Sequence, residues 1–399
     1  MRLKKIGILI LLLVFLVPNF SKADDNFLDN NAVTNLSDVN AHLVVSELNT
    51  GKIISKRGEN EKVSVGKLPN YLALYLLTDN LKNKKITLED KISIASGDDI
   101  LSKYKIESSI TVKDAIFLLE NENSNSLNRA VFTHFNITLD KAKETLAAMS
   151  LHDTKLESLD NNGNNTSTAK NISYLTSLIL KNYPEITEIT KNPEHTLASG
   201  EKINNSVEFK ESDKFRVLGL DYSDKNSVTY AYSGNTKLII TVLNQSDDKA
   251  TYFDKLQKTY DYLFSNYSYK LALKAGTYTI NNERITFNED IYDLFYEKHS
   301  IKDVTYLLMN KKILLFQKYG TISANEGTVF SDFSSNDNTG NLAKIKSNFI
   351  NDENFDKKDN YEKTTIVIDR TKYFATGILA IYTLVFAALY VMRQVVRKD

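Results

Sequence analysis

Residues 373–392 form a run of twenty residues without a charged side chain. A helix rises about 1.5 Å per residue, so this run is long enough to cross a hydrocarbon core of about 30 Å. Arg393, Arg397 and Lys398 follow directly, and cationic flanks favour the cytoplasmic side. A helix lying on the membrane surface would need a polar stripe, which this run lacks. We therefore predict a single transmembrane helix over residues 373–392 and a cytoplasmic tail over residues 393–399.

Residues 1–23 have the parts of a secretory signal peptide. Cationic side chains precede an apolar run over residues 6–17, and the small residues Ser21 and Ala23 are typical of a signal-peptidase site. With the C-terminal anchor, this predicts a single-pass protein of the cell membrane whose main part is extracellular.

The composition excludes several classes of function. The formal net charge is zero, and the part between signal and anchor is mildly acidic, which argues against a nucleic-acid partner. The chain has no cysteine, so disulfides and thiol chemistry are excluded. The five histidines are scattered without metal-ligand spacing, and no glycine-rich phosphate loop is present. We expect neither a metal nor a cofactor.

The extracellular part is too long for one typical core, so more than one domain is expected. Residues 24–266 mix strand-like runs, such as residues 236–243, with helical periodicity over residues 68–81, 112–132 and 172–180. This mixture indicates an α+β or α/β domain. Residues 267–333 change to short alternating segments, which predict β-hairpins of a smaller, β-rich domain. Residues 334–372 are rich in Ser, Asn, Asp and Lys and are interpreted as a stalk or linker.

The clearest chemical motif is Ser64-Val65-Gly66-Lys67, and we expect Ser64 to open the helix that carries Lys67. A serine hydroxyl is a weak nucleophile until a base takes its proton, and a lysine three residues later on a helix stands on the same face. The spacing alone is weak evidence, because it occurs five times in the chain. Its context favours Ser64, since a strand and turn precede it and a largely apolar helix follows it.

This arrangement resembles the low-molecular-mass penicillin-binding proteins, which are serine-type D-Ala-D-Ala carboxypeptidases. The membrane-anchored Gram-positive type of this family is the nearest in pattern. Further segments resemble the family along nearly the whole mature chain: residues 86–94, 110–115, 151–156, the Asn162-Gly163 loop, residues 167–172, 182–186, 274–282 and 288–294.

The resemblance implies a penicillin-binding-protein or β-lactamase-like transpeptidase domain of α+β class, followed by the small β-rich domain and the membrane helix. It also implies a wall-facing role in peptidoglycan metabolism. In the family's mechanism, Ser64 would attack the penultimate D-Ala carbonyl, Lys67 would be the general base and Asn125 would orient the substrate amide. The implied partners are a peptidoglycan stem peptide or a β-lactam, without a cofactor.

The family's second motif, Ser-x-Asn, is altered. Counting without gaps from Thr111 places Asn123-Ser124-Asn125 there, so Asn123 replaces the proton-relaying serine. A shifted register through Ser126 and Asn128 would restore both the serine and the asparagine of the motif, but it needs a three-residue insertion. Loss of a positioned proton-transfer group typically costs about 10²–10⁴-fold in rate.

The third motif, Lys-Thr-Gly, is altered further. Val217-Leu218-Gly219 occupies its place, so both polar groups that hold the substrate's terminal carboxylate in the family are missing. The main-chain N–H of Leu220 would remain as an oxyanion donor. Arg216 is a nearby cation, but neighbouring strand side chains point to opposite faces, so its side chain points away from the surface that Val217 occupies unless a bulge rotates it.

Two further points bear on the site. Lys214 is a second nearby cation with the same problem of orientation, and Pro69 lies where it would kink the helix that carries Lys67. Two hypotheses remain open: a working or residual D,D-peptidase, and a relative with impaired or lost catalysis that binds the wall or a partner as a scaffold. The lost groups favour the second, with weak or absent binding of stem peptide and β-lactam.

Overall fold

The structure is a computed structural model of the whole chain. It describes residues 30–36, 41–161, 164–205, 215–223, 225–280, 283–297, 304–309, 312–317, 328–331 and 334–335. The predicted signal peptide, nearly all of the stalk, the predicted membrane helix and its tail, Lys214 and the Asn162-Gly163 loop lie outside these residues. Among the residues that are described, no helix has the length and apolar character needed to cross a bilayer.

The chain divides into two compact units. The first contains Met1–Lys270, Asp293–Ser300 and Tyr319–Thr328, and the second contains Leu271–Tyr292, Ile301–Lys318 and Val329–Asp399. All residues of the candidate site belong to the first unit.

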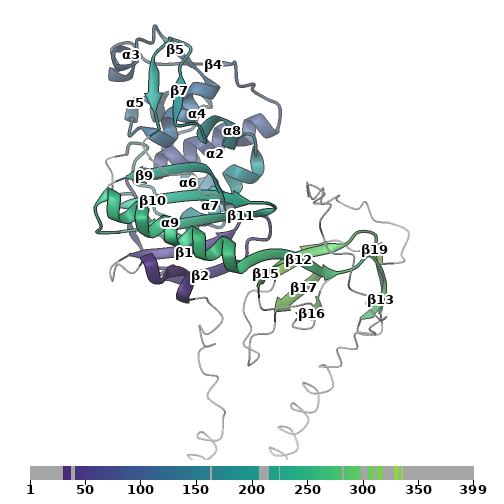
Figure 1. The fold of residues 1–399 in the computed structure, drawn as a ribbon. Coiled ribbons are helices and arrows are strands. Elements are labelled where there is room, and N and C mark those ends of the chain that lie inside the picture. The colour runs from purple at the N-terminus through teal and green to yellow at the C-terminus, as the bar shows by residue number, and fades with distance from the viewer. Residues whose placement is uncertain are drawn as a thin grey trace, which may run out of the picture. The chain divides into compact units, whose positions relative to one another are not determined.

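A five-stranded antiparallel sheet is the centre of the first unit (Figure 1). Its strand order is β2-β1-β11-β10-β9, so β9 lies at one edge. The strands are β1 (His42–Glu47), β2 (Ile53–Arg57), β9 (Arg216–Ser223), β10 (Asn226–Ser233) and β11 (Thr236–Leu243). Strands β1, β10 and β11 are buried along most of their length, as expected for a sheet covered on both faces.

Helices cover both faces of this sheet (Figure 1). On one face lies α9 (Lys249–Asn266), whose Tyr260 hydroxyl is 2.7 Å from the Thr229 hydroxyl of β10. The next residue, Tyr230, points to the opposite face, where its hydroxyl is 2.9 Å from Thr190. That face carries α2 (Leu68–Lys82), α4 (Val112–Asn121), α7 (Ala169–Asn182) and α8 (Ile186–Thr190).

The described residues of the first unit also form three α-helices outside the layer next to the sheet, one 3₁₀ helix and three short ladders. The helices are α3 (Asp99–Lys103), α5 (Asn125–His134) and α6 (Leu139–Ala148), and η1 (Asn30–Leu36) is a 3₁₀ helix. The ladders pair β3 (Val63–Ser64) with β6 (Thr166–Ser167), β4 (Lys91–Ser93) with β5 (Ser109–Thr111), and β7 (Glu194–Thr196) with β8 (Lys202–Asn204).

Side-chain caps fix where several helices begin. The hydroxyl or carboxylate oxygen of the N-cap residue accepts a hydrogen bond from a backbone N–H of the first turn in α4, α5, α6, α7 and α9. These caps are Thr111, Ser124, Thr138, Thr168 and Asp248, all residue types that favour this position. Helix α2 has no side-chain cap, which bears on the site described below.

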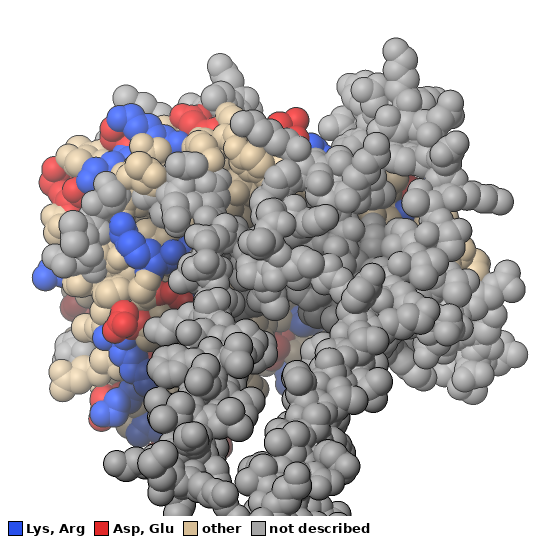
Figure 2. Space-filling view, turned by 90° about the horizontal axis from the view of Figure 1, so that it is seen from below, with Lys and Arg blue, Asp and Glu red and all other residues tan. Residues whose placement is uncertain are grey.

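The second unit contributes strands to small sheets. The expected hairpin is present as β13 (Gly276–Ile280) paired with β14 (Glu283–Phe287), and β14 pairs with β19 (Ser334–Ser335). A second sheet has the order β16 (Val304–Met309), β17 (Lys312–Gln317), β18 (Thr328–Ser331). Strand β12 (Tyr267–Leu273), which pairs with β15 (Ile291–Tyr296), has residues in both units, and so does β15. Charged side chains of both signs are interspersed on the described surface that Figure 2 shows.

Candidate functional site

The prediction that Ser64 opens the helix carrying Lys67 is wrong. Ser64 ends the short strand β3, and α2 begins only at Leu68, with Pro69 as its second residue. Proline has no N–H to donate to the carbonyl four residues earlier, and its ring crowds that carbonyl. Pro69 therefore keeps Val65 out of the helix. Instead of kinking the helix, as the sequence suggested, it lies in the first turn, where its missing N–H is tolerated.

The backbone of Ser64 is held by other segments of the unit. Ser64 pairs with Thr166 of β6, and its carbonyl oxygen accepts a 3.1 Å hydrogen bond from the side-chain amide of Asn226. The next residue, Val65, donates its N–H to the Asn165 carbonyl at 2.9 Å. Ser64 is exposed to solvent. The serine is thus attached to the end of the sheet, through Asn226 of β10, and to the loop before α7.

Lys67 is buried at the start of α2, with only 6% of its surface exposed. Its ammonium nitrogen donates a 3.1 Å hydrogen bond to the main-chain carbonyl of Glu120 near the end of α4. Gly66, the residue before it, packs against the loop at Asn161: a Cβ atom at position 66 would lie 3.1 Å from the Asn161 carbonyl oxygen. A larger residue at position 66 would push these two segments apart.

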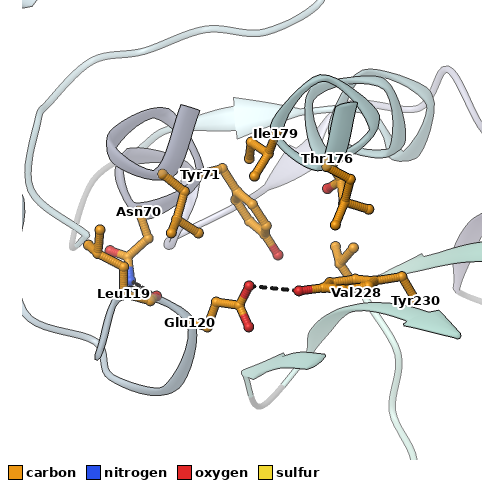
Figure 3. Close-up of a pocket in the computed structure, with 10 residues that line it drawn as sticks. Asn70, Tyr71, Leu119, Glu120, Thr176, Ile179, Val228 and Tyr230 are labelled. Atoms are coloured by element: carbon orange, nitrogen blue, oxygen red, sulfur yellow. Dashed lines mark hydrogen bonds between the residues drawn. The ribbon is translucent and has the colours of Figure 1, made fainter. Parts of the chain in front are cut away.

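Glu120 connects this region with the sheet. Its side chain is buried, and its carboxylate accepts a 2.9 Å hydrogen bond from the Tyr230 hydroxyl. Figure 3 shows the two groups facing each other at a small cavity, with the hydroxyl of Tyr71 pointing toward the same place. The cavity of about 20 Å³ has room for about one water molecule. The sequence analysis did not identify Glu120. A charged residue directly after the apolar run of α4 could have indicated a buried polar contact.

Three buried asparagines join α2, α5 and the loop before β6. The side-chain amide of Asn128 donates to the side-chain oxygens of Asn70 at 2.9 Å and of Asn161 at 2.8 Å. Asn161 in turn donates to Asn70 at 2.7 Å. The amide of Asn70 donates to the main-chain carbonyls of Leu119 at 2.7 Å and of Glu122 at 2.9 Å. This cluster fixes the segment between α4 and α5 against the helix that follows Lys67.

The residues of the second motif lie at the start of α5. Asn123 is exposed and precedes the helix, and Asn125 is its first residue. The side-chain oxygen of Asn125 accepts the main-chain N–H of Asn161 at 2.6 Å. In the alternative register, Ser126 and Asn128 are both buried inside α5. The ungapped register therefore places its residues at the connection before α5, and the shifted register places them in the helix interior.

The third-motif residues lie on the edge strand β9. Gly219 pairs with Tyr230 and Val217 pairs with Ala231, so Leu218 is an extra residue in the ladder, as in a β-bulge. The bulge considered from the sequence therefore occurs. Beyond it, Arg216 pairs with Tyr232, two residues along from Tyr230. Leu220 pairs with Thr229.

A buried acid–histidine pair lies in the helical layer beside the site. A carboxylate oxygen of Asp114 is 2.7 Å from His195 Nε2, and its other oxygen accepts the Ala198 N–H at 3.0 Å. Burial alone would raise the pKa of Asp114, but the hydrogen bonds from His195, Ala198 and Thr111 lower it below its usual value. His195 also stacks on Phe117. This pair is part of the packed core.

Within the described ranges, no three His, Asp or Glu side chains gather as metal ligands. No family model and no curated protein matches the sequence. Solved structures do match the fold.

A peptidoglycan synthesis regulatory factor, PBP3 of Streptococcus pneumoniae, superimposes with a TM-score of 0.56 at 18% identity, over 72% of this chain and 96% of that one. Penicillin-binding protein 5 of Haemophilus influenzae gives 0.57 at 15% identity, over 73% and 96%. The D-alanyl-D-alanine carboxypeptidase DacD of Francisella tularensis gives 0.53 at 14% identity, over 74% and 93%. The chain has the α+β fold of the low-molecular-mass penicillin-binding proteins, as the sequence resemblance predicted.

Proposed function

We propose that this protein is a wall-facing relative of the D-Ala-D-Ala carboxypeptidases that acts in peptidoglycan metabolism by binding, with acyl transfer impaired or lost. The fold supports the peptidoglycan context. The observation that carries the loss of catalysis is the separation of Ser64 from the helix that carries Lys67.

A lysine activates a serine three residues before it when one helical turn places both side chains on the same face. Here Ser64 is on an exposed strand, whereas Lys67 is buried and donates to the Glu120 carbonyl. This hydrogen bond uses Lys67 to hold the end of α4 beside α2. This contact supports a structural role for Lys67.

The altered second and third motifs also support an impaired or lost acyl transfer. Asn123 replaces the serine that transfers a proton in the family. The side-chain oxygen of Asn125 already accepts a hydrogen bond from the main-chain N–H of Asn161. Val217 and Leu218 replace the two groups that hold a terminal carboxylate in the family. Removing one partner of a buried charge pair costs about 2–5 kcal/mol, so a carboxylate-terminated peptide or a β-lactam should bind weakly.

Main-chain recognition does not depend on those side chains. Strand β9 is the edge of the central sheet, and an edge strand can bind an extended peptide through its N–H and C=O groups. We propose that the protein retains this mode for wall peptides. We also propose that residues 373–392 anchor it in the membrane, which rests on the sequence alone.

The test is acylation of the full-length protein in detergent by a fluorescent penicillin, read by intact mass, beside Ser64→Ala. We expect no adduct from the folded wild-type protein, together with retention on purified peptidoglycan sacculi. An adduct that disappears in Ser64→Ala would contradict the loss of catalysis and support an active D,D-peptidase. Absence of both the adduct and the retention would contradict the peptidoglycan role.

A further inference from the structure

The small cavity beside Glu120 has a further polar side chain on its wall. Thr176 of α7 lines this cavity, and only 5% of its surface is exposed. Among the residues that the structure describes, its hydroxyl oxygen has no hydrogen-bond partner. Folding removes such a hydroxyl from water, and leaving it without a new partner destabilises the folded state. The position of Thr176 therefore indicates a ligand inside the cavity.

The helix offers this hydroxyl an acceptor that it does not use. A threonine inside a helix can donate to the main-chain carbonyl four residues earlier. Thr78, Thr190 and Thr259 do so, at donor–acceptor distances of 2.9, 3.2 and 2.9 Å. Thr176 does not form the equivalent bond to the carbonyl of Ile172. Its hydroxyl is thus left to a partner in the cavity that it lines.

Two other polar side chains face the same space. Figure 3 shows Glu120 of α4 and Tyr71 of α2 directed toward the cavity, with Thr176 on its wall. The three polar groups therefore come from three different helices. Aliphatic side chains form much of the remaining lining: Leu74, Leu119, Ile179, Leu180 and Val228.

The size and the lining of the cavity suit a water molecule better than an ion. Its volume of about 20 Å³ holds about one water molecule, and a buried water forms about two to four hydrogen bonds. The groups of Thr176, Glu120 and Tyr71 supply that number. A buried ion would need polar ligands or opposite charge around it, whereas much of this wall is aliphatic.

We propose that this cavity is a binding site for a single water molecule, which accepts a hydrogen bond from the Thr176 hydroxyl and donates one to the Glu120 carboxylate. The bound water joins α7 to the end of α4, at the residue whose main-chain carbonyl accepts the ammonium group of Lys67. It therefore helps to hold the acceptor of Lys67 in place. This inference does not depend on the peptidoglycan role.

X-ray diffraction from crystals of the full-length protein tests the site directly, with Thr176→Val and Thr176→Ser beside the wild type. We expect a density peak in the cavity within about 2.5–3.2 Å of the Thr176 hydroxyl oxygen. The peak should persist in Thr176→Ser, which keeps the hydroxyl, and disappear in Thr176→Val. Wild-type crystals in which no peak occupies the cavity would overturn the proposal. So would a peak that gives an anomalous signal after growth in thallium(I), because it would identify a monovalent cation.

Thermal melting of the full-length protein in detergent gives a second test, because the sign of the shift depends on the water. Thr176→Val removes a hydroxyl at nearly constant volume. If the hydroxyl binds a water, its loss should lower the melting temperature by about 2–4 °C. If the hydroxyl is buried without a partner, valine should raise the melting temperature, which would overturn the proposal.

Thr133→Val is the matched control, since Thr133 is an exposed threonine inside α5, and its melting temperature should stay close to that of the wild type. Should Thr176→Val fail to fold, the diffraction result on the wild type still decides between a bound water and no ligand.

Discussion

The hydroxyl of Tyr230 donates a hydrogen bond to the carboxylate of Glu120, 2.9 Å away, between the central sheet and the end of α4. The main-chain carbonyl of the same Glu120 accepts the ammonium group of Lys67. One buried residue therefore links the start of α2, the end of α4 and strand β10. The three elements around the candidate site are thus joined through the carboxylate and the main-chain carbonyl of one residue.

Replacing Tyr230 with Phe should destabilise the first unit. The change removes the donor to a buried carboxylate and a hydroxyl partner of Thr190, and an unsatisfied buried polar group costs about 1–3 kcal/mol. Urea unfolding should show this loss. Tyr174→Phe is the matched control, because this tyrosine is 48% exposed on α7, and its stability should change little. Equal losses in both variants would mean that the Glu120 contact contributes nothing.

Replacing Asn128 with Ala should also destabilise the fold. The side-chain amide of Asn128 donates to two buried oxygens, and the truncation removes both hydrogen bonds and leaves a cavity. We expect a loss of about 2–3 kcal/mol in the free energy of unfolding. Asn123→Ala, at an exposed position a few residues earlier, should be near neutral. Chemical denaturation that gives Asn128→Ala the stability of the wild type would contradict this role for the amide cluster.

Asp114 should give the protein an acid-labile component of stability. Its pKa is lowered in the folded protein, so its contribution is complete above the unfolded value near about 4 and is lost as pH falls through the lower folded value. Asp114→Asn should therefore be less stable than wild type at pH 6. The difference should narrow below about pH 4. The free energy of unfolding should be measured across this pH range for the wild type, for Asp114→Asn and for the surface control Asp140→Asn. A difference between wild type and Asp114→Asn that stays constant with pH would contradict the prediction.

The ion pair between Lys52 and Asp293 should contribute more to the free energy of unfolding than an exposed ion pair does. Lys52, beside the turn between β1 and β2, lies 2.7 Å from the fully buried carboxylate of Asp293. Lys52→Met leaves that carboxylate without its cation, which should cost about 3 kcal/mol. Lys62→Met removes one partner of an exposed pair with Asp153, and its cost should stay below about 1 kcal/mol. Differential scanning calorimetry that gives the two variants the same melting temperature would contradict the distinction.

Local patterns predicted much of the fold. The apolar helix expected over residues 68–81 is α2, and the strand expected over residues 236–243 is β11. The helical periodicity expected over residues 112–132 is interrupted after Asn121, because Ser124 caps a new helix. Residues 120–126 contain no apolar side chain, and this polar stretch marks the break that the predicted range ran across.

The geometry of the site could be predicted only in part. Pro69 was recognised as a disturbance, but the sequence could not decide between a kinked helix and a later start, because that depends on whether a neighbouring strand pairs with Ser64. The contact between Glu120 and Tyr230 joins residues 110 positions apart, beyond the reach of any local pattern. The bulge at Leu218 likewise depends on the pairing of two strands.

The side-chain amide of Asn226 holds the carbonyl of Ser64, and the side-chain oxygen of Asn226 accepts the Asn244 N–H at 3.0 Å. Ser64 is thereby held at the end of the sheet, whereas Lys67 directly precedes α2 and donates a hydrogen bond to the end of α4. The sheet holds one of these residues and the helical layer holds the other. The distance between their side chains therefore depends on how the sheet and the helices that cover it are placed against each other.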